Sequence, residues 1–221
     1  MNPIGPLIER IFFERRGIKL AQAIAPLLPT NGSLLDVGCG DGEIDLRLKQ
    51  LRPDVEFTGI DVQLRNSSAI PVQHFDGTTI PFPDRSFDAV MFVDVLHHTQ
   101  DPAILLKEAL RVARRFIILK DHTRDGLLAF HTLAVMDWLG NAHHHIPLPF
   151  HFLSKAEWLA LFDQLQLKVD SWNSNLGQYP ASVGWIVERQ LHMVARLSIP
   201  NGDSTASTSI PDETHAPQPP G

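Results

Sequence analysis

Glycine and acidic residues crowd one short segment of the chain, Asp36-Val37-Gly38-Cys39-Gly40-Asp41-Gly42-Glu43. Glycines let a backbone turn sharply and let a ligand approach without a Cβ in the way. A predicted helix follows, and the free N–H groups of a helix N-terminus attract a carboxylate or a phosphate. The segment is not a dinucleotide-binding pattern, because Glu43 stands where the third glycine would fall. It is not a phosphate-binding P-loop either, because no Gly-Lys-Ser/Thr follows it.

Two further carboxylates stand at the predicted ends of the next two strands. Asp61 comes about 20 residues after the glycine-rich turn, where a carboxylate can accept both hydroxyls of a ribose. Asp76 directly precedes Gly77, and a carboxylate beside an exposed backbone N–H suits the edge of an adenine ring. Each residue alone is more often a plain turn residue, but together they predict a nucleoside pocket.

Apolar runs and helical spacing predict the elements that would position these residues. Residues 4–25 carry apolar side chains at helical spacing, with charges between them. Strands are predicted over residues 33–37, 57–62, 72–75, 86–96, 115–120, 167–172 and 189–197, and helices over 41–50, 102–111, 127–139 and 155–167. Strands that alternate with helices indicate an α/β fold with a parallel sheet and helices on both faces. Ligands of such sheets bind outside the carboxyl ends of the strands.

The motifs at these strand ends resemble those of a known family. Residues 34–42, Leu-Leu-Asp-Val-Gly-Cys-Gly-Asp-Gly, resemble motif I of the class I methyltransferases, and residues 59–62, Gly-Ile-Asp-Val, resemble their second motif. Asp76-Gly77, residues 81–88 and Leu96-His97-His98 are similar to the small-molecule branch (methyltransferase type 11) that includes quinone-ring methyltransferases. The resemblance covers residues 32–120. It implies S-adenosyl-L-methionine as cofactor and a Rossmann-like seven-stranded sheet in the order 3-2-1-4-5-7-6, with the last strand antiparallel.

The resemblance also implies which residues bind the cofactor. They are Asp36, Gly38, Cys39, Gly40, Asp61, Val62, Asp76, Gly77 and Asp94. The glycine-rich backbone would line the methionine moiety, and Asp36 would reach its ammonium group. Asp61 would hold the ribose hydroxyls, and Asp76 with the next N–H would bind adenine. Asp94, at the predicted end of the fourth strand, would face the side of methyl transfer.

Three polar residues near the fourth and fifth strands are candidates for acid–base chemistry. Methyl transfer from a sulfonium requires alignment and exclusion of water, and an O- or N-acceptor must also lose a proton. His98 is the first candidate base, because it matches the Leu-x-His ending of the fourth strand in the family. Asp121 and His122 are expected just after the fifth strand and are candidates for contact with the acceptor. Each of the three could instead pack or cap without a catalytic role.

Histidines also cluster later in the chain, at residues 143–145 and at His151. Three consecutive residues in one loop rarely point at one ion, and cysteine or carboxylate partners at ligand spacing are missing there. We therefore expect no metal.

The acceptor is predicted by elimination to be a small molecule, hydrophobic or aromatic. The chain has Asp94-Val95-Leu96-His97 where amino-group methyltransferases of nucleic acids carry Asn/Asp-Pro-Pro-aromatic. It lacks the Pro-Cys of cytosine methylation and the paired glutamates of arginine methylation. Two alternatives stay open: a catalytically inactive scaffold that binds S-adenosyl-L-methionine, and an NAD-dependent dehydrogenase, which would need a glycine at position 43.

Composition restricts partners and location. The formal net charge of −6 and the pI of about 6.0 argue against nucleic acid as main partner. Cys39 is the only cysteine, which fits a reducing compartment, and no apolar run reaches about 18 residues, so the cytoplasm is predicted. Phe12 and Phe13 lie beside basic residues, which leaves weak peripheral membrane contact open.

The chain divides into three predicted regions. Residues 1–30 are expected to form an N-terminal helical cap, and residues 31–198 the methyltransferase domain. Within that domain, residues 121–160 form a long, partly aromatic insertion, which is expected to act as a lid over the acceptor. Residues 199–221 are rich in Pro, Ser, Thr and Gly and are predicted to be a disordered tail.

Overall fold

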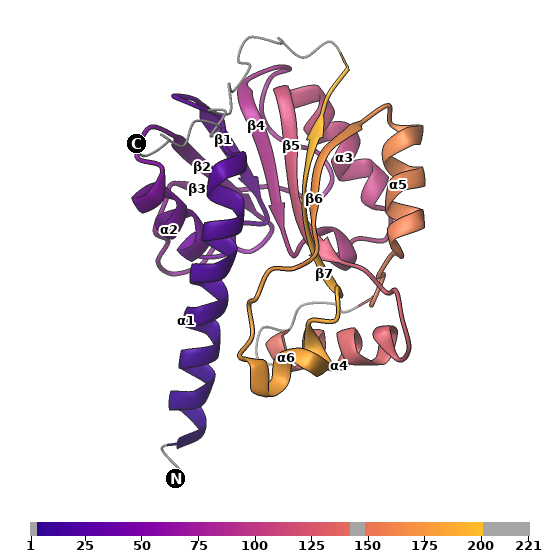
Figure 1. Cartoon of the computed structure of the whole chain (residues 1–221). Coiled ribbons are helices and arrows are strands. Elements are labelled where there is room, and N and C mark those ends of the chain that lie inside the picture. Colours follow the sequence, from indigo (N-terminus) through magenta and orange to yellow (C-terminus); the bar gives the residue numbers. More distant parts are fainter. Residues whose placement is uncertain (1–3, 142–148, 201–221) are drawn as a thin grey trace, which may run out of the picture.

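A single sheet of seven strands organises the described part of the chain. The computed structural model describes residues 4–141 and 149–200. The strands are β1 (Ser33–Val37), β2 (Glu56–Asp61), β3 (Val72–His74), β4 (Phe87–Val93), β5 (Ala113–His122), β6 (Lys168–Asn173) and β7 (His192–Ser198), in the order β3-β2-β1-β4-β5-β7-β6 (Figure 1). β7 pairs antiparallel with both β5 and β6, whereas the β1–β5 pairings are parallel. The predicted fold and strand order are confirmed.

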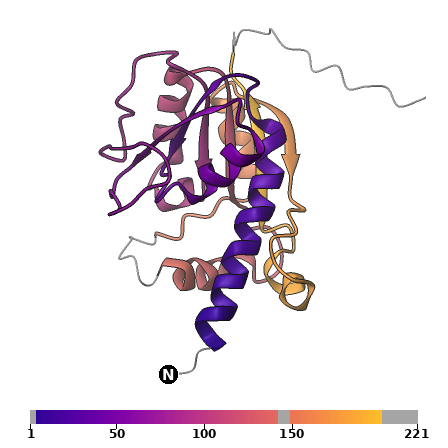
Figure 2. The same ribbon diagram turned by 90° about the vertical axis from the view of Figure 1, so that its left-hand side faces the viewer.

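Helices cover both faces of this sheet. On one face lie α1 (Ile4–Ile24) and α2 (Glu43–Leu51), and on the other lie α3 (Pro102–Val112) and α5 (Lys155–Gln164) (Figures 1 and 2). Two further helices, α4 (Ala129–Asn141) and α6 (Ala181–Val187), lie together at one end of the molecule, near the N-terminal half of α1 (Figure 1). Two 3₁₀ turns, η1 (Ala25–Leu27) and η2 (Leu96–His98), complete the described elements.

The central strand β4 explains why its sequence is continuously apolar. Val90 and Phe92 belong to the apolar cluster under α3 and α5, whereas Ala89 and Met91 belong to the cluster under α1 and α2. All four side chains are fully buried. Successive strand residues point to opposite faces, so a strand covered on both faces needs apolar residues at every position.

Local capping signals set two helix starts as predicted. The Asp101 side chain accepts a hydrogen bond from the backbone N–H of Ala103, and Pro102 occupies the first position of α3. Ser154 and Glu157 form a reciprocal capping box at the start of α5. The predicted end of α5 at residue 167 is wrong, because the helix stops at Gln164.

Other element boundaries also differ from prediction. Asp121 and His122 do not follow the fifth strand but lie inside β5, where they pair with Met193 and His192 of β7. Helix α6 was not predicted. Ile199, the first residue of the predicted tail, is buried against the core, and its N–H donates to the Arg115 carbonyl at 3.3 Å. Residues 201–221 of that predicted tail lie outside the described residues.

Within the described residues, no helix has both the length and the apolar character needed to cross a membrane.

Candidate functional site

The glycine-rich turn between β1 and α2 has the shape of a ligand cradle. Gly38, Gly40 and Gly42 all adopt positive φ, which favours glycine. A Cβ on Gly38 would lie 2.6 Å from Cγ2 of Val95, so only glycine fits there. A Cβ on Gly40 would meet no atom within 4 Å, so this part of the turn faces open space. The backbone of Gly40 is therefore accessible to a ligand.

Asp61 ties this turn to the end of β2. Its Oδ2 accepts the N–H of Gly40 at 2.8 Å, and its Oδ1 accepts the N–H of Gln63 at 2.8 Å. A carboxylate has about four acceptor positions, so two remain available for the hydroxyls of a ribose. Val62, the next residue, is 55% exposed, and a Cβ on Gly77 would lie 3.2 Å from it. The ends of β2 and β3 therefore meet where the nucleoside was predicted.

Asp76 is a turn residue in its own right. Its Oδ1 accepts hydrogen bonds from the backbone N–H groups of Thr78 and Thr79 and from the Thr78 hydroxyl, at 2.7–2.9 Å. These bonds, that of Thr79 first, lower the pKa of the Asp76 carboxyl. An ionised Asp76 at this exposed position can also accept a hydrogen bond from an amino group of a ligand.

Asp36 forms a buried acidic pair with Asp45, and Asp45 was not predicted from the sequence. Asp36 of β1 is 2% exposed, and Asp45 of α2 is fully buried. Burial, followed by the charge of Asp45, raises the pKa of Asp36, and burial raises the pKa of Asp45 to about 7. Apart from the contact of the two carboxyl groups with each other, Oδ1 of Asp36 and both oxygens of Asp45 have no hydrogen-bond partner among the described residues. A cationic group of a ligand would suit this pair. An acidic residue at a buried position of a helix is the signal from which Asp45 could have been predicted.

Cys39 lies in the same turn and is not equipped as a nucleophile. Burial, followed by the charges of Asp36 and Asp45, raises the pKa of its thiol. The thiol therefore stays protonated, which removes the reactive thiolate form. Instead, the side chain packs against Gly59, where an added Cβ would lie 2.4 Å from Sγ.

We expect the affinity for S-adenosyl-L-methionine to rise as the pH increases from 5.5 to 7. The ligand's ammonium would favour ionised carboxylates at Asp36 and Asp45, so binding below the Asp45 pKa of about 7 must release a proton. The nearby carboxylates Asp41 and Asp61 are present both in the unmodified protein and in the control variant below. The expected rise is up to about tenfold per pH unit, while the ligand's amine remains charged. Calorimetric titrations at several pH values measure it, with Asp45→Asn as the control that should make the curve shallower, because only Asp36 of the pair remains. Equal affinities of the unmodified protein across this range would contradict the assignment.

Asp94 follows β4 and has a left-handed backbone conformation. Its side chain pairs with two basic side chains. Its carboxylate pairs with Arg16 of α1 and with Lys120 of β5, whose side chain is fully buried. Burial alone would raise the pKa of Asp94, but Lys120 and Arg16 hold it well below its usual range. His122 also approaches, with Nε2 3.3 Å from Oδ1 of Asp94. Asp94 thus joins α1 to the sheet at the strand ends.

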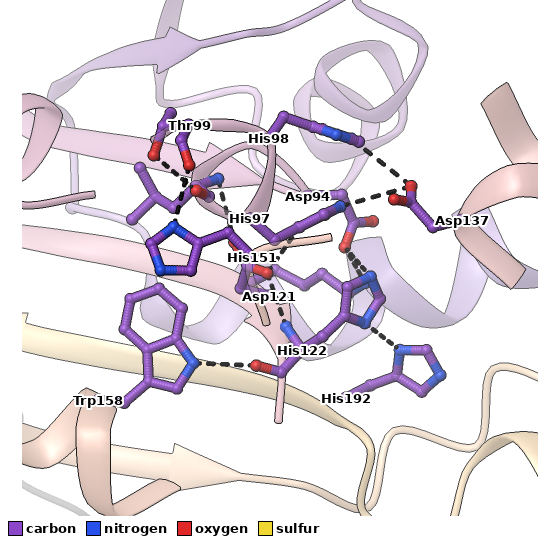
Figure 3. A network of polar contacts seen from close by, with 12 residues as sticks. Asp94, His97, His98, Thr99, Asp121, His122, Asp137, His151, Trp158 and His192 are labelled. Carbon is purple, nitrogen blue, oxygen red and sulfur yellow. Dashed lines mark hydrogen bonds and ion pairs between the residues drawn. The ribbon is translucent and has the colours of Figure 1, made fainter. Parts of the chain in front are cut away.

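A second polar group surrounds His97 (Figure 3). Nδ1 of His97 lies 2.7 Å from Oδ1 of Asp121, whose Oδ2 accepts the N–H of Leu96 at 3.1 Å. Asp121 is fully buried, so it positions His97 and the η2 turn and does not face open space. Burial would lower the pKa of His97, but Asp121 raises it to about 10.

The two other candidate bases are neutral histidines. His98 has a side chain that is 20% exposed, and burial, followed by the charge of His97, lowers its pKa. Burial and Lys120 hold the pKa of His122 well below its usual range, and its Nδ1 lies 3.0 Å from Nδ1 of His192. A neutral imidazole can accept a proton, and His98 is the more exposed of the two.

Four polar residues at this site were not predicted from the sequence. They are Arg16, Lys120, Asp137 and His192. Arg16 and Asp137 come from helices α1 and α4, far from β4 in sequence. The residue pattern of one sequence contains no signal for contacts between such distant segments. Residues 143–145 of the histidine-rich segment lie outside the described residues, while His151 places Nδ1 3.2 Å from the Thr99 carbonyl.

Comparison with known proteins identifies the family. Residues 10–172 match the model of the methyltransferase domain family. The chain is similar to 27-O-demethylrifamycin SV methyltransferase of Amycolatopsis mediterranei, at 32% identity over 48% of this chain and 44% of that protein. It is also similar to demethylmenaquinone methyltransferase of Roseiflexus castenholzii, at 33% identity over 45% of each protein.

Solved structures agree on the fold. A chain in the complex between the Haloferax volcanii Trm112 methyltransferase activator and a methyltransferase superposes with a TM-score of 0.64, at 18% identity. The match covers 85% of this chain and 92% of that one.

The family model spans well over half of the chain, so the protein belongs to the methyltransferase domain family. The methyltransferase family predicted from the motifs is confirmed, and S-adenosyl-L-methionine is the cofactor of this class. The chain spans somewhat less than half the length of the curated relatives named above.

Proposed function

We propose that the protein transfers a methyl group from S-adenosyl-L-methionine to a small hydrophobic or aromatic molecule. The proposal rests on two groups of residues that lie next to each other at one edge of the sheet. The glycine-rich turn with Asp36 and Asp61 follows β1 and β2, and the buried histidine group follows β4 and ends β5. Cofactor and acceptor chemistry would meet between neighbouring strands, as expected at the carboxyl edge of a parallel sheet.

The residues present fit the cofactor. The open backbone at Gly40, with Gly38 and Cys39, would line the methionine moiety, and the buried oxygens of Asp36 and Asp45 suit its ammonium. The remaining acceptor positions of Asp61, beside Val62, would take the ribose hydroxyls. Asp76 and the N–H of Gly77 would bind adenine. When bound, the cofactor supplies an electrophilic methyl group on a sulfonium, and these residues orient it.

The chain's own contribution to the acceptor would be position and proton transfer. His98 is neutral and partly exposed, so its imidazole can take a proton from a hydroxyl or amine. Asp121 acts indirectly, because it fixes His97 and the η2 turn that carries His98. His122 and Asp94 would close the inner wall of the same space, with Asp94 held by Lys120 and Arg16.

Exposed apolar side chains near the site support a hydrophobic acceptor. They belong to the loop before α4, to α4 and to α6, and α4 and α6 lie together in Figure 1. They are Leu127, Leu128, Phe130, Val135, Trp138, Leu139, Trp185 and Ile186, each 42–82% exposed. The names of the relatives point to a rifamycin and a demethylmenaquinone. Phe13, which is 52% exposed on α1 beside basic residues, would allow weak peripheral contact with a membrane. The acidic net charge and the single cysteine favour a cytoplasmic protein without a nucleic-acid partner.

Replacing Trp138 by alanine is expected to raise the acceptor KM or lower kcat several-fold while leaving cofactor affinity nearly unchanged. Trp138 is 56% exposed on α4, within the predicted lid of residues 121–160. His122→Ala should affect turnover in the same direction. Ile104→Ala, a 46% exposed apolar position on α3 and outside the predicted lid, is the matched control and should leave turnover as it is. Unaltered turnover in Trp138→Ala, together with its loss in Phe13→Ala, would place the acceptor on α1 instead.

A turnover assay separates the proposed enzyme from an inactive binding scaffold. The protein is incubated with S-adenosyl-L-methionine and a panel of phenols, hydroquinones and fatty acids, and the demethylated cofactor is quantified. Acceptor-dependent product that falls in His98→Ala supports the proposal. Tight cofactor binding without product from any acceptor class would favour the scaffold.

A further inference from the structure

We propose that His97, His98 and Asp137 form a binding site for one divalent transition-metal ion. His97 and His98 lie on η2, directly after β4, and Asp137 lies on α4. Nε2 of each histidine is 3.7 Å from Oδ1 of Asp137, and the three ligand atoms all lie within 4.8 Å of one another (Figure 3). Two imidazole nitrogens and one carboxylate oxygen therefore converge on one point.

The distances are close to those of ligands that share one ion. Each separation of 3.7 Å from Oδ1 of Asp137 is within ion-pair range and longer than an ordinary hydrogen bond between an imidazole and a carboxylate. Zinc binds nitrogen and oxygen at about 2.0–2.2 Å, so two ligand atoms at a tetrahedral angle lie about 3.4 Å apart. The two separations from Oδ1 of Asp137 need a shift of only a few tenths of an ångström to reach this value.

Asp121 supplies the outer support that such a site requires. Metal-bound histidines usually hydrogen-bond through their second ring nitrogen to a carboxylate, which fixes the ring and leaves the first nitrogen for the ion. Nδ1 of His97 makes this contact with Asp121 at 2.7 Å. Asp121 is in turn held by the N–H groups of Leu96 and His122, at 3.1 and 2.8 Å. His97 is therefore fixed with Nε2 directed to the proposed site.

A neighbouring set of ligand atoms is less suited to an ion. Asp94, His97 and His122 also lie within 4.8 Å of one another. However, Asp94 already pairs with Lys120 and Arg16, so a dication there would face two positive charges at contact range. The side chains of His97 and Asp137 are almost fully buried, and His98 leaves one edge open to entry.

The ligand types indicate which ions would bind. Imidazole nitrogen suits zinc, cobalt, nickel and iron, whereas magnesium and calcium prefer sites made of oxygen ligands. The ion would join η2 to α4, the helix that carries Trp138. It would occupy Nε2 of His98, so His98 acts as a base only in the metal-free protein. Among the described residues, a small apolar cluster packs this helix, with Ala129, Leu133, Phe152 and Leu191 as its buried members. Metal binding would thus add a polar tie between α4 and the strand ends.

The test is metal binding by the full chain after treatment with a chelator. Zn²⁺ is titrated by calorimetry, and Co²⁺ is followed by its visible absorption, which reports nitrogen–oxygen coordination. The expected result is one equivalent of either ion, with a rise in Tm, and no such rise with Mg²⁺. Asp137→Asn and His98→Ala should abolish this stoichiometric binding. His131→Ala, an exposed histidine on the same helix, is the matched control and should keep it.

Two further variants keep the outcome decisive. Asp121→Asn should weaken Zn²⁺ binding by roughly 10- to 100-fold without removing a ligand. A variant with alanine at residues 143, 144 and 145 should still bind one equivalent. Loss of binding in that variant, or full binding in both Asp137→Asn and His98→Ala, would overturn the proposal. Because His98 is partly exposed, its variant decides the matter if Asp137→Asn does not fold.

Discussion

Replacing Asp94 by alanine is expected to lower the free energy of unfolding by about 3–5 kcal/mol. The change would leave the ammonium of Lys120 fully buried without its carboxylate, and it would release Arg16 of α1 from the sheet. Burial already lowers the pKa of Lys120, and Asp94 is the charge that opposes this effect. Loss of Asp94 should therefore destabilise the charged lysine and loosen α1 together.

Urea unfolding of the two proteins at pH 7 measures this difference. The control is Asp84→Ala, which removes a surface ion pair to Arg111, where the aspartate side chain is 75% exposed. Exposed pairs contribute little, so the control should shift the midpoint only slightly. If Asp94→Ala unfolds at the same urea concentration as Asp84→Ala, the buried charge network does not stabilise the fold as described.

Asp61→Ala is expected to weaken the binding of S-adenosyl-L-methionine by about 2–4 kcal/mol, or roughly 30- to 1,000-fold. Two effects act in the same direction. The ribose hydroxyls would lose a charged acceptor, and the N–H of Gly40 would lose the bond that fixes the glycine-rich turn. Affinity should fall while the core, which Asp61 does not fill, stays intact.

A variant of the same turn serves as the control. Asp41→Ala removes an exposed carboxylate that accepts the N–H of Glu43 at 3.1 Å but does not touch Asp61. It should bind the cofactor within a few-fold of the unmodified protein. Comparable affinities of Asp61→Ala and Asp41→Ala would show that the ribose is not held at the end of β2.

The part of the site that follows β1, β2 and β3 was predictable because its signals are local. Gly38 and Gly40 are needed by the backbone itself, Asp61 lies at the end of one predicted strand, and Asp76 directly follows another. The fold was predictable for the same reason, since β4 is buried on both faces and its sequence is apolar at every position.

The other half of the site depends on contacts between distant segments. Arg16 reaches Asp94 from α1, and Asp137 approaches the histidines from α4, and neither residue differs in its local pattern from a solvated helix charge. The polar pair Asp121 and His122 seemed to end a strand. In the structure both continue β5, because β7 pairs with them and buries their backbone. Only the partner strand, which follows much later in the chain, determines that boundary.

The most direct test of the central claim is a calorimetric titration of the protein with S-adenosyl-L-methionine, its demethylated product and NAD. The glycine-rich turn, the acidic pair at Asp36 and Asp45, and Asp61 together predict saturable one-to-one binding of the first two ligands and none of NAD. Absence of binding heat with S-adenosyl-L-methionine at millimolar ligand concentration, or binding of NAD in its place, would contradict the account.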